Sequence, residues 1–270
     1  MASELTSPLH PAAPRWPALL LNPWLLGLLV AAVLLAAWWH AEGSLPPALA
    51  HLWQWSPALV RGMWTNIYIS MLAMAIGTVA GLVVGALALS QWAGLRSATR
   101  WYVQAFRNAP ILVLIYFTTY VFPFELQLLH WRLPFPDWIK VVLGLALPTS
   151  AVVAEIFRGA IQSIPTAQWE AAQSLAFKRR QIFGWIILPQ CVRRMLPPWM
   201  NLYASITMST SLASLVGVHD IVDTAQIASN TVARTDFTIL VYFTLLALFF
   251  AYCYPIARTT RRLEKRHAFR

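Results

Sequence analysis

Six long stretches of this chain carry almost no charge, and this feature limits its fold more than any other. Five of them contain no Asp, Glu, Lys or Arg and one contains only Glu155; they cover residues 23–39, 62–90, 108–124, 141–157, 195–219 and 237–257. A helix that crosses the hydrocarbon core of a bilayer needs about 20 mostly apolar residues. The sequence therefore predicts an all-α, polytopic membrane protein with six transmembrane helices.

The amino-acid composition agrees with a membrane protein. Only 11% of the 270 residues are charged and 59% are hydrophobic, with a mean hydropathy of +0.58, whereas soluble domains carry about 25% charged residues. The first stretch raises the alternative of a cleaved secretory signal, which has a basic start and a small-residue cleavage site. Arg15 is the only base before the first stretch. This stretch ends in Trp38 and Trp39, which are typical of a membrane interface. We therefore expect a retained span.

The Lys and Arg residues are distributed unevenly between the two sides of the membrane that six spans define. With the N-terminus inside, 16 of the 20 fall on the inner side and four outside, namely Arg61, Arg132, Lys140 and Arg234. Basic loops stay on the cytoplasmic side. The net charge of +10 is therefore a topology signal, with membrane lipids as secondary partners, and it does not indicate nucleic acid. We expect a multi-pass membrane protein with cytoplasmic N- and C-termini.

The apolar stretches and the polar segments between them divide the chain into three parts. Residues 1–57 comprise a cytoplasmic tail, an extra N-terminal transmembrane helix and most of an external connection that covers residues 40–60. Residues 58–257 form a five-helix core, and residues 258–270 form a basic cytoplasmic tail. A second external segment, residues 122–140, contains three prolines, which predicts a loop with a short surface helix.

Two patterns within the predicted spans have structural explanations. Gly77, Gly81 and Gly85 recur every fourth residue and lie on one face of a helix, where small residues let a neighbouring helix approach closely. Glu155 lies near the inner end of its span and Arg158 follows at i+3, so the two side chains can pair on the helix surface. A structural pair and a functional role are both open for Glu155 and Arg158.

The motifs of several enzyme classes are absent from the sequence. It has no Gly-x-x-x-x-Gly-Lys-Ser/Thr phosphate loop, no His-Glu-x-x-His zinc motif and no Gly-x-Ser-x-Gly elbow, and its six histidines have no metal-ligand spacing. We therefore predict no catalytic residue, no metal site and no ATP hydrolysis in this chain. Ion-coupled carriers usually bury several titratable residues, and Glu155 is the main candidate here. A secondary carrier or channel that works without ATP is the main alternative function, and a membrane-embedded enzyme or assembly scaffold is another.

The longest polar stretch, residues 159–194, falls on the inner side and contains a predicted short helix near residues 165–178. Pro165 and Thr166 favour a helix start. Glu170 lies near the first turn, where the helix dipole favours an acid. The helix is expected to end at the basic run Lys178-Arg179-Arg180.

This short helix is predicted to present a face of small residues. Ala172 and Ala176 are four residues apart, and Leu175 adds an apolar contact beside them. Such a face fits a groove on a soluble partner. The alternative is an amphipathic helix that lies on the lipid surface.

The same segment resembles the signature of a known family. Residues 170–172, Glu-Ala-Ala, followed by Ile-Leu-Pro at 187–189, are similar to the EAA motif of permease subunits in ATP-binding cassette (ABC) importers. Residues 106–110, Phe-Arg-Asn-Ala-Pro, resemble the Phe-Arg-Gly-Thr-Pro run of polar amino-acid permeases of the histidine, glutamate, glutamine and arginine type. Residues 154–165 match that branch closely. The chain is thereby identified as a member of this family, over about residues 58–265.

The resemblance implies a type I ABC importer permease fold with a cytoplasmic coupling helix, in the bacterial inner membrane. It assigns the coupling role to Glu170, Ala171, Ala172, Leu175 and Ala176. The implied partners are an ATP-binding cassette ATPase subunit, which holds ATP and magnesium, a second and non-identical permease subunit, and a periplasmic or lipid-anchored amino-acid-binding protein. No cofactor is expected in this chain. Ala167 and Ala176 stand where the family has glycine, which reduces local backbone freedom.

The resemblance also indicates a substrate path. The candidate residues are Gln104, Arg107, Asn108, Ser209 and Thr210. Similar permeases have Lys-Asp-Thr-Ser where residues 208–211 read Met-Ser-Thr-Ser, so the Lys and the Asp are missing. Either the second permease carries the binding groups or this pocket uses hydroxyl and backbone groups, and helix packing by these polar residues is the alternative. The sequence does not identify the solute, although the segments at Asn108 and Ser211 are more similar to glutamate/aspartate-type permeases than to arginine-type ones.

Overall fold

The computed structural model of the chain describes residues 46–128 and 131–267. The chain forms two compact units, Met1–His51 and Leu52–Arg270, and the second contains nearly all of the described residues. The predicted first span, residues 23–39, lies outside the described residues.

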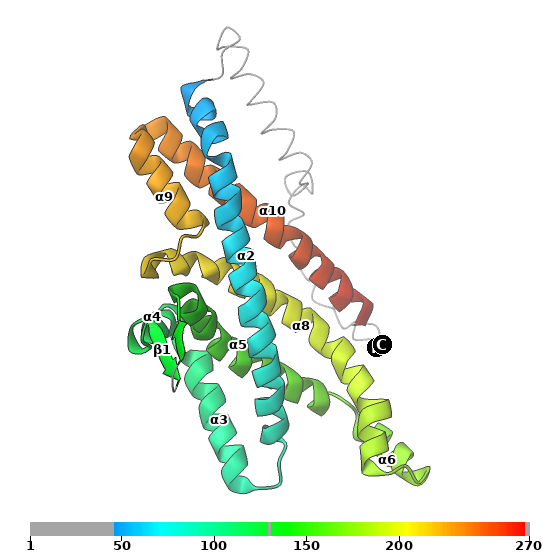
Figure 1. Cartoon of the computed structure of the whole chain (residues 1–270). Helices are drawn as coiled ribbons and strands as arrows, with labels where there is room; N and C mark the ends of the chain where they lie inside the picture. Colours follow the sequence, from blue (N-terminus) through cyan, green and yellow to red (C-terminus); the bar gives the residue numbers. More distant parts are fainter. Residues whose placement is uncertain (1–45, 129–130, 268–270) are drawn as a thin grey trace, which may run out of the picture. The chain divides into compact units, whose positions relative to one another are not determined.

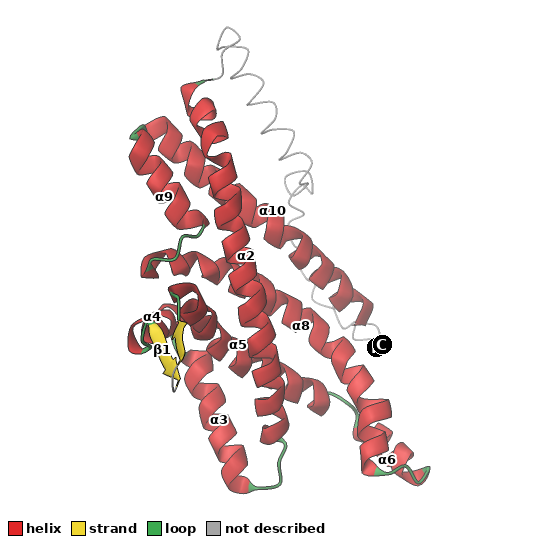
Figure 2. Ribbon diagram, in the orientation of Figure 1, coloured by secondary structure: helices red, strands yellow, loops and turns green. Residues whose placement is uncertain are grey.

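The described residues are almost entirely helical (Figure 1, Figure 2). The structure consists, in chain order, of α2 (Pro47–Ala88), α3 (Ala93–Asn108), α4 (Ile111–Val121), β1 (Glu125–Leu128), β2 (Trp131–Pro134), α5 (Asp137–Gln162), α6 (Thr166–Ser174), α7 (Arg179–Gln181), the π-helix η1 (Ile182–Ile187), α8 (Leu188–Ser209), the 3-10 helix η2 (Thr210–Val216), α9 (Ile221–Val232) and α10 (Thr235–His267).

Three helices in the described part of the chain are long and apolar enough to cross a membrane: α2, α5 and the Thr235–Glu264 part of α10. The predicted stretch 108–124 forms only the 11-residue helix α4, which begins after Pro110 and ends before Pro123. The predicted stretch 195–219 is divided between α8 and η2. For the other three of the six predicted transmembrane helices, the prediction rests on the sequence alone.

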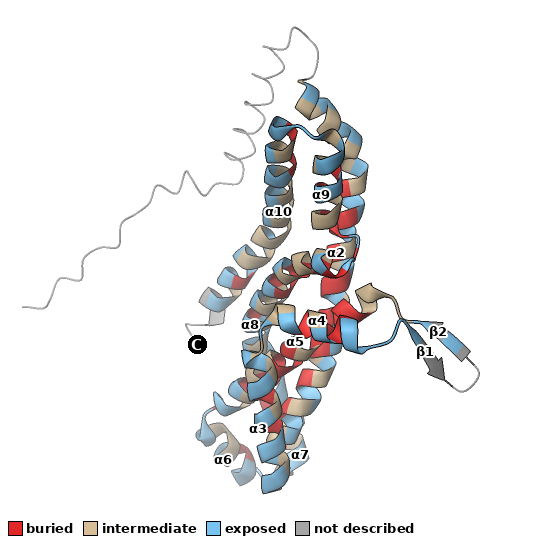
Figure 3. Ribbon diagram, turned by 90° about the vertical axis from the view of Figure 1, so that its left-hand side faces the viewer, coloured by how far each residue is buried: buried red, intermediate tan, exposed pale blue. Residues whose placement is uncertain are grey.

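The segment between α4 and α5 differs from the sequence prediction. The prediction of a loop with a short surface helix was wrong, because β1 and β2 pair as an antiparallel hairpin in which Glu125 lies opposite Pro134. The sequence of β1 and the residue before it, Phe-Glu-Leu-Gln-Leu, alternates apolar and polar residues, the period of a strand. Proline is tolerated at strand ends and before helices, and Pro136 is the N-cap of α5. The hairpin extends away from the helices in Figure 3.

Helical structure also extends into segments that were expected to be connections. Residues 47–60 belong to α2, so the expected external connection over residues 40–60 is helical from Pro47 onward. The Arg-containing segment after α2 forms α3, whose Tyr102 hydroxyl lies 2.7 Å from the Ser150 hydroxyl of α5. The basic tail continues α10 up to His267.

Helix α5 is the central element of the second unit. Two thirds (67%) of its most apolar 18-residue window is buried, against 11% for α10. The main hydrophobic core gathers buried side chains from α2, α4, α5, α8, η2 and the residue Val218: Ile69, Ala73, Ile115, Val141, Val142, Leu145, Ile206, Ala213, Val216 and Val218. In Figure 3, buried positions gather where α4 and α5 lie. The outer faces of α2 and α10 are exposed and apolar, as expected for helices in lipid.

The three glycines of α2 lie where this helix crosses α5. A Cβ atom on Gly77 would be 2.5 Å from the Thr149 side chain, and one on Gly81 would be 2.6 Å from the Ser150 carbonyl oxygen. A Cβ atom on Gly85 would lie 2.8 Å from the ring of a phenylalanine in α5. The glycine face therefore lets the two backbones approach within a distance that no side chain permits.

Candidate functional site

The predicted coupling segment forms α6 and ends in a Schellman motif. The Phe177 amide donates to the Ala172 carbonyl over 3.2 Å, and the Ala176 amide donates to the Gln173 carbonyl over 2.9 Å. In this motif the residue after the C-cap adopts the left-handed conformation, and glycine is usual there. Ala176 occupies that position with a φ of +59°, so the alanine that replaces the family's glycine carries backbone strain.

The burial of α6 corrects two parts of the sequence prediction. Ala172 is buried against the chain itself, in a cluster with Ala160, Ile164, Ile182, Ile187 and Cys191. Ala176 has left the helix, so Ala172 and Ala176 do not form one exposed small-residue face. Glu170 is the fifth residue of α6 and not part of its first turn, so the helix dipole does not stabilise it there.

The exposed surface of α6 consists of other residues of the predicted set. Glu170, Ala171 and Ala176 are exposed, and Leu175 is 73% exposed. These exposed side chains are available for contact with another protein. The surface available to a partner is therefore formed by Glu170, Ala171, Leu175 and Ala176, with Ala172 as its internal support.

A second connection joins α6 to α8. The Gln190 side chain donates to the Gln168 side-chain oxygen over 2.7 Å and to the Ile186 carbonyl over 2.9 Å. Between them lies the π-helix η1, which runs directly into α8; Pro189 lies in the first turn of α8, where its missing N–H is tolerated. These hydrogen bonds link α6 to the start of α8.

Three arginines lie around the end of α5 that leads to α6, and two of them contact the Glu155 carboxylate. Arg158 donates to Glu155 from Nε over 3.3 Å and from Nη2 over 2.8 Å. The Nη1 atom of Arg107, on α3, lies 3.8 Å from Glu155 Oε2. Arg194, on α8, donates to the carbonyl and hydroxyl oxygens of Ser163 over 2.9 Å each.

A cleft of about 450 Å³, which we call the arginine cleft, opens beside Arg107, Glu155 and Arg194. Its lining consists of Arg107, Val152, Glu155, Ile156, Gly159, Ala160, Ser163, Arg194 and Pro198. Two arginines and a single carboxylate line the cleft, so it has a positive balance. Such a surface favours a solute that carries a carboxylate.

The other predicted path residues divide into two groups. Gln104 and Asn108 are exposed on α3, and the side-chain nitrogen of Asn108 donates to the backbone carbonyl of Gln104 over 2.9 Å. Ser209 is half-buried and its hydroxyl donates to the Ser205 carbonyl. Thr210 is fully buried. Thr210 is therefore not exposed to a solute in this structure, whereas Gln104, Arg107 and Asn108 are.

Thr210 belongs to a buried polar network that the sequence prediction missed. The Asn66 side-chain nitrogen donates to the Thr210 hydroxyl over 3.0 Å and to Asp220 Oδ2 over 3.1 Å. Its side-chain oxygen accepts from the Ile221 amide over 3.1 Å. The available signal was an amide side chain in a long uncharged stretch, and polar residues inside a membrane are usually paired.

Asp220 is the N-cap of α9. Its Oδ1 atom accepts from the Asp223 amide over 2.8 Å. Burial raises the pKa of the Asp220 carboxyl from its ordinary 3.8 to about 6, although hydrogen bonds from the Asp223 amide and from Asn66 lower it.

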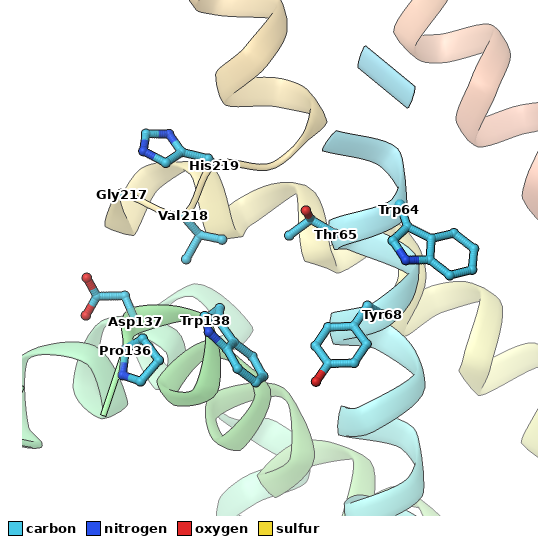
Figure 4. Close-up of a pocket in the computed structure, with 9 residues that line it drawn as sticks. All are labelled: Trp64, Thr65, Tyr68, Pro136, Asp137, Trp138, Gly217, Val218 and His219. Atoms are coloured by element: carbon cyan, nitrogen blue, oxygen red, sulfur yellow. The ribbon is translucent and has the colours of Figure 1, made fainter. Parts of the chain in front are cut away.

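A second cleft of about 590 Å³ opens at the start of α5, and we call it the aromatic cleft (Figure 4). It is lined by Trp64, Thr65 and Tyr68 of α2, by Pro136, Asp137 and Trp138, and by Gly217, Val218 and His219. The Tyr68 and Trp138 rings face one another with centroids 5.4 Å apart. His219 Nδ1 lies 2.7 Å from Asp223 Oδ2.

The charge of Asp137 in this cleft is compensated from inside the protein. Lys140 is fully buried, and its ammonium group donates to Asp137 Oδ1 over 3.1 Å and to the Thr119 carbonyl over 3.3 Å. It also lies 3.8 Å from the centre of the Phe124 ring, which is a favourable cation–π position. Lys140 therefore joins the start of α5 to α4 and to the base of the hairpin.

Comparison with protein families gives a match over most of the chain. Residues 77–266 match the family described as "Binding-protein-dependent transport system inner membrane component". The probable amino-acid ABC transporter permease protein YckA of Bacillus subtilis (strain 168) is 32% identical over 213 residues, which cover 78% of this chain and 90% of YckA. The octopine transport system permease protein OccM of Rhizobium radiobacter is 32% identical over 218 residues, which cover 80% of this chain and 88% of OccM.

Solved structures show the same fold. The structure titled "Crystal structure of an amino acid ABC transporter with histidines" superposes with a TM-score of 0.69 at 24% identity, over 80% of this chain and 96% of that one. The family resemblance inferred from the EAA and amino-acid permease motifs is thus confirmed. This chain belongs to the family of inner-membrane components of binding-protein-dependent transport systems, the permease subunits of ABC importers.

Proposed function

We propose that this chain is the permease subunit of an ATP-driven importer of polar amino acids. The similarity to YckA and OccM, over about nine tenths of each relative's length, carries the proposal. A permease of this family works in the inner membrane with an ATPase subunit and a substrate-binding protein. The chain itself transports and does not catalyse; ATP and magnesium are bound by the partner ATPase.

The positions of the two clefts support a path along α5. The aromatic cleft includes Asp137 and the arginine cleft includes Glu155, which are 18 residues apart on the same helix. At 1.5 Å per residue this corresponds to roughly 27 Å, close to the ~30 Å thickness of the hydrocarbon core. The aromatic cleft then opens outside and the arginine cleft inside, with both termini cytoplasmic, as the distribution of Lys and Arg predicts.

The proposed path uses Gln104, Arg107 and Asn108 of α3 at its inner end, where they are exposed to a solute. Arg107 is the strongest candidate for a solute carboxylate, because its side chain is 57% exposed and its contact with Glu155 is 3.8 Å long. The positive balance of the arginine cleft agrees with an acidic solute of the glutamate/aspartate type. Ser209 and Thr210 serve the path through helix packing in the state seen here.

The exposed surface of α6 is the proposed contact with the ATPase. Glu170→Lys reverses the charge of that surface, and Leu175→Ser removes its exposed apolar side chain. Both variants should reduce solute-stimulated ATP hydrolysis of the reconstituted complex strongly. Leu89→Ser, which changes an exposed leucine in the turn after α2, is the matched control and should have little effect. Normal stimulation in both Glu170→Lys and Leu175→Ser would contradict the proposed coupling role.

The solute class is tested with the complete complex in liposomes. Uptake of a panel of labelled amino acids is measured with and without ATP inside. We expect ATP-dependent uptake of at least one polar amino acid, with acidic members preferred. Uptake that is equally fast without ATP would favour a secondary carrier.

The second permease is tested by purifying the complex through a tag on this chain. We expect a second, non-identical permease to be recovered with it, and a single permease species would contradict the heterodimer.

A further inference from the structure

The buried network of Asn66, Thr210 and Asp220, which we call the Asn66 clamp, joins three separate elements. Asn66 belongs to α2, Thr210 is the first residue of η2, and Asp220 caps α9. All three are fully buried. Every polar atom of the Asn66 side chain is used: the nitrogen donates to Thr210 and Asp220, and the oxygen accepts from the Ile221 amide.

The clamp connects the two sides of the aromatic cleft. Thr65 and Tyr68, close to Asn66 on α2, line one side. Gly217 and His219, which precede Asp220, line the other. In Figure 4 the segment 217–219 lies across the cleft from α2. The Asn66 hydrogen bonds therefore link the two sides of the cleft.

The backbone at the clamp is adapted to a close contact. A Cβ atom on Gly62, one helical turn before Asn66, would lie 2.7 Å from the Ile221 Cα atom. At the other end of η2, Gly217 has a φ of +82°, the left-handed conformation that lets the chain turn back toward α2. Both features place Asp220 and Ile221 directly against α2.

We propose that Asn66 is a positioning residue for transport, because the clamp holds the segment Thr210–Asp220 against α2 and so keeps the aromatic cleft in its narrow state. This inference rests on the proposed function, in which the aromatic cleft is the outer opening of the path. The path residues Ser209 and Thr210 lie where α8 changes into η2, so a change at the clamp also displaces this part of the path. Alternating access then requires the clamp to open and close as a unit.

The test compares two changes on α2 that each remove a hydrogen bond to another element. Asn66→Leu keeps a similar volume and removes the clamp. Thr78→Val removes the bond from Trp199 Nε1 on α8, which is 2.8 Å long and lies outside both clefts. The readouts on the complete complex are the number of solute molecules imported per ATP hydrolysed and the distance between spin labels at Thr65→Cys and His219→Cys, with Cys191 and Cys253 replaced by serine.

We expect Asn66→Leu to lower the number of solute molecules imported per ATP hydrolysed by roughly tenfold, because the fraction of molecules with a narrow aromatic cleft depends exponentially on the free energy of the lost contacts. The same change should lengthen or broaden the distance between the spin labels at positions 65 and 219. Thr78→Val should change neither readout. Thr210→Val, which removes one of the three Asn66 bonds, should act in the same direction but less strongly, and it serves if Asn66→Leu does not assemble. An unchanged ratio and distance in Asn66→Leu and Thr210→Val, or equal effects in Thr78→Val, would overturn the proposal.

The two proposals fail in different ways. If the unmodified complex imports no amino acid, the proposed function fails, while the 65–219 distance still reports whether Asn66 sets the width of the cleft. If the complex imports amino acids with ATP but the clamp variants behave like Thr78→Val, only the role of Asn66 fails.

Discussion

Ala176 and Gly217 occupy the same position in two copies of one capping motif. Each is the left-handed residue after a helix, with φ of +59° at Ala176 and +82° at Gly217. After η2 the Val218 amide donates to the Ala213 carbonyl and the Gly217 amide to the Ser214 carbonyl, as the corresponding amides do after α6. One motif has the residue that suits this conformation and the other does not.

This relationship predicts opposite effects for two exchanges. Ala176→Gly should stabilise the end of α6, because a left-handed alanine costs about 1–2 kcal/mol and the added freedom of the unfolded chain offsets only about 0.4–1 kcal/mol. Gly217→Ala should destabilise η2, although a Cβ atom there would meet nothing within 4 Å. Hydrogen exchange of residues 170–178 and 210–219 measures both effects. Ala171→Gly, inside α6, should destabilise; a similar loss of protection in Ala176→Gly would refute the strain at Ala176.

The glycine face of α2 predicts a position-dependent penalty. Gly81→Ala would bring a methyl group within 2.6 Å of the Ser150 carbonyl oxygen on α5, and overpacking of this kind costs roughly 1–3 kcal/mol. Gly94→Ala, at a position with no atom within 4 Å of the added Cβ, is the matched control. The melting temperature of the purified permease should fall for Gly81→Ala and stay the same or rise for Gly94→Ala. Equal melting temperatures would mean that α2 and α5 are less closely packed in the protein than the Gly81 contact in this structure indicates.

The two arginines at Glu155 should have different roles. Arg158 makes two short contacts with Glu155, and Arg107 makes one at 3.8 Å. Arg158→Gln should therefore lower stability more than Arg107→Gln, by less than about 1 kcal/mol because these side chains are partly exposed. Arg107→Gln should reduce uptake more than Arg158→Gln, since Arg107 is the more exposed of the two beside Glu155. The same order of the two variants in melting and uptake assays would contradict this division.

The long apolar helices could be predicted from the sequence, because an uncharged stretch of 20 residues has few alternatives to a span. This holds for α2, α5 and α10. The ends of the elements could not be predicted in the same way. A hydropathy pattern does not indicate where an α-helix changes into a 3-10 helix, so the break at Thr210 was missed, and α2 begins earlier than its uncharged stretch because Trp and Pro in its first turns are compatible with a helix.

The candidate site was partly accessible from sequence. The Glu155–Arg158 pair could be predicted from the i+3 spacing, whereas the sequence placed Ala176 on a helix face and its left-handed conformation appears only in the structure. The burial of Ala172 and Thr210 depends on contacts with residues far away in the chain, such as Asn66 with Thr210, 144 positions apart. No local pattern contains that information.

The raised pKa of Asp220 predicts a pH dependence of stability. A carboxyl whose pKa in the folded protein is raised from 3.8 to about 6 binds its proton more tightly in the folded state. Its stabilising contribution is therefore complete below pH 3.8 and is lost as the pH rises through about 6, by roughly 3 kcal/mol in total at 1.36 kcal/mol per pKa unit. The melting temperature of the purified permease is measured between pH 4 and 7.5, together with that of Asp220→Asn, which cannot ionise. The difference between the two proteins isolates the contribution of Asp220, and the wild type should lose stability relative to the variant as the pH rises from 4 to 7. Parallel curves would show that Asp220 keeps an ordinary pKa, and that water or a partner reaches a carboxyl that is buried in this structure.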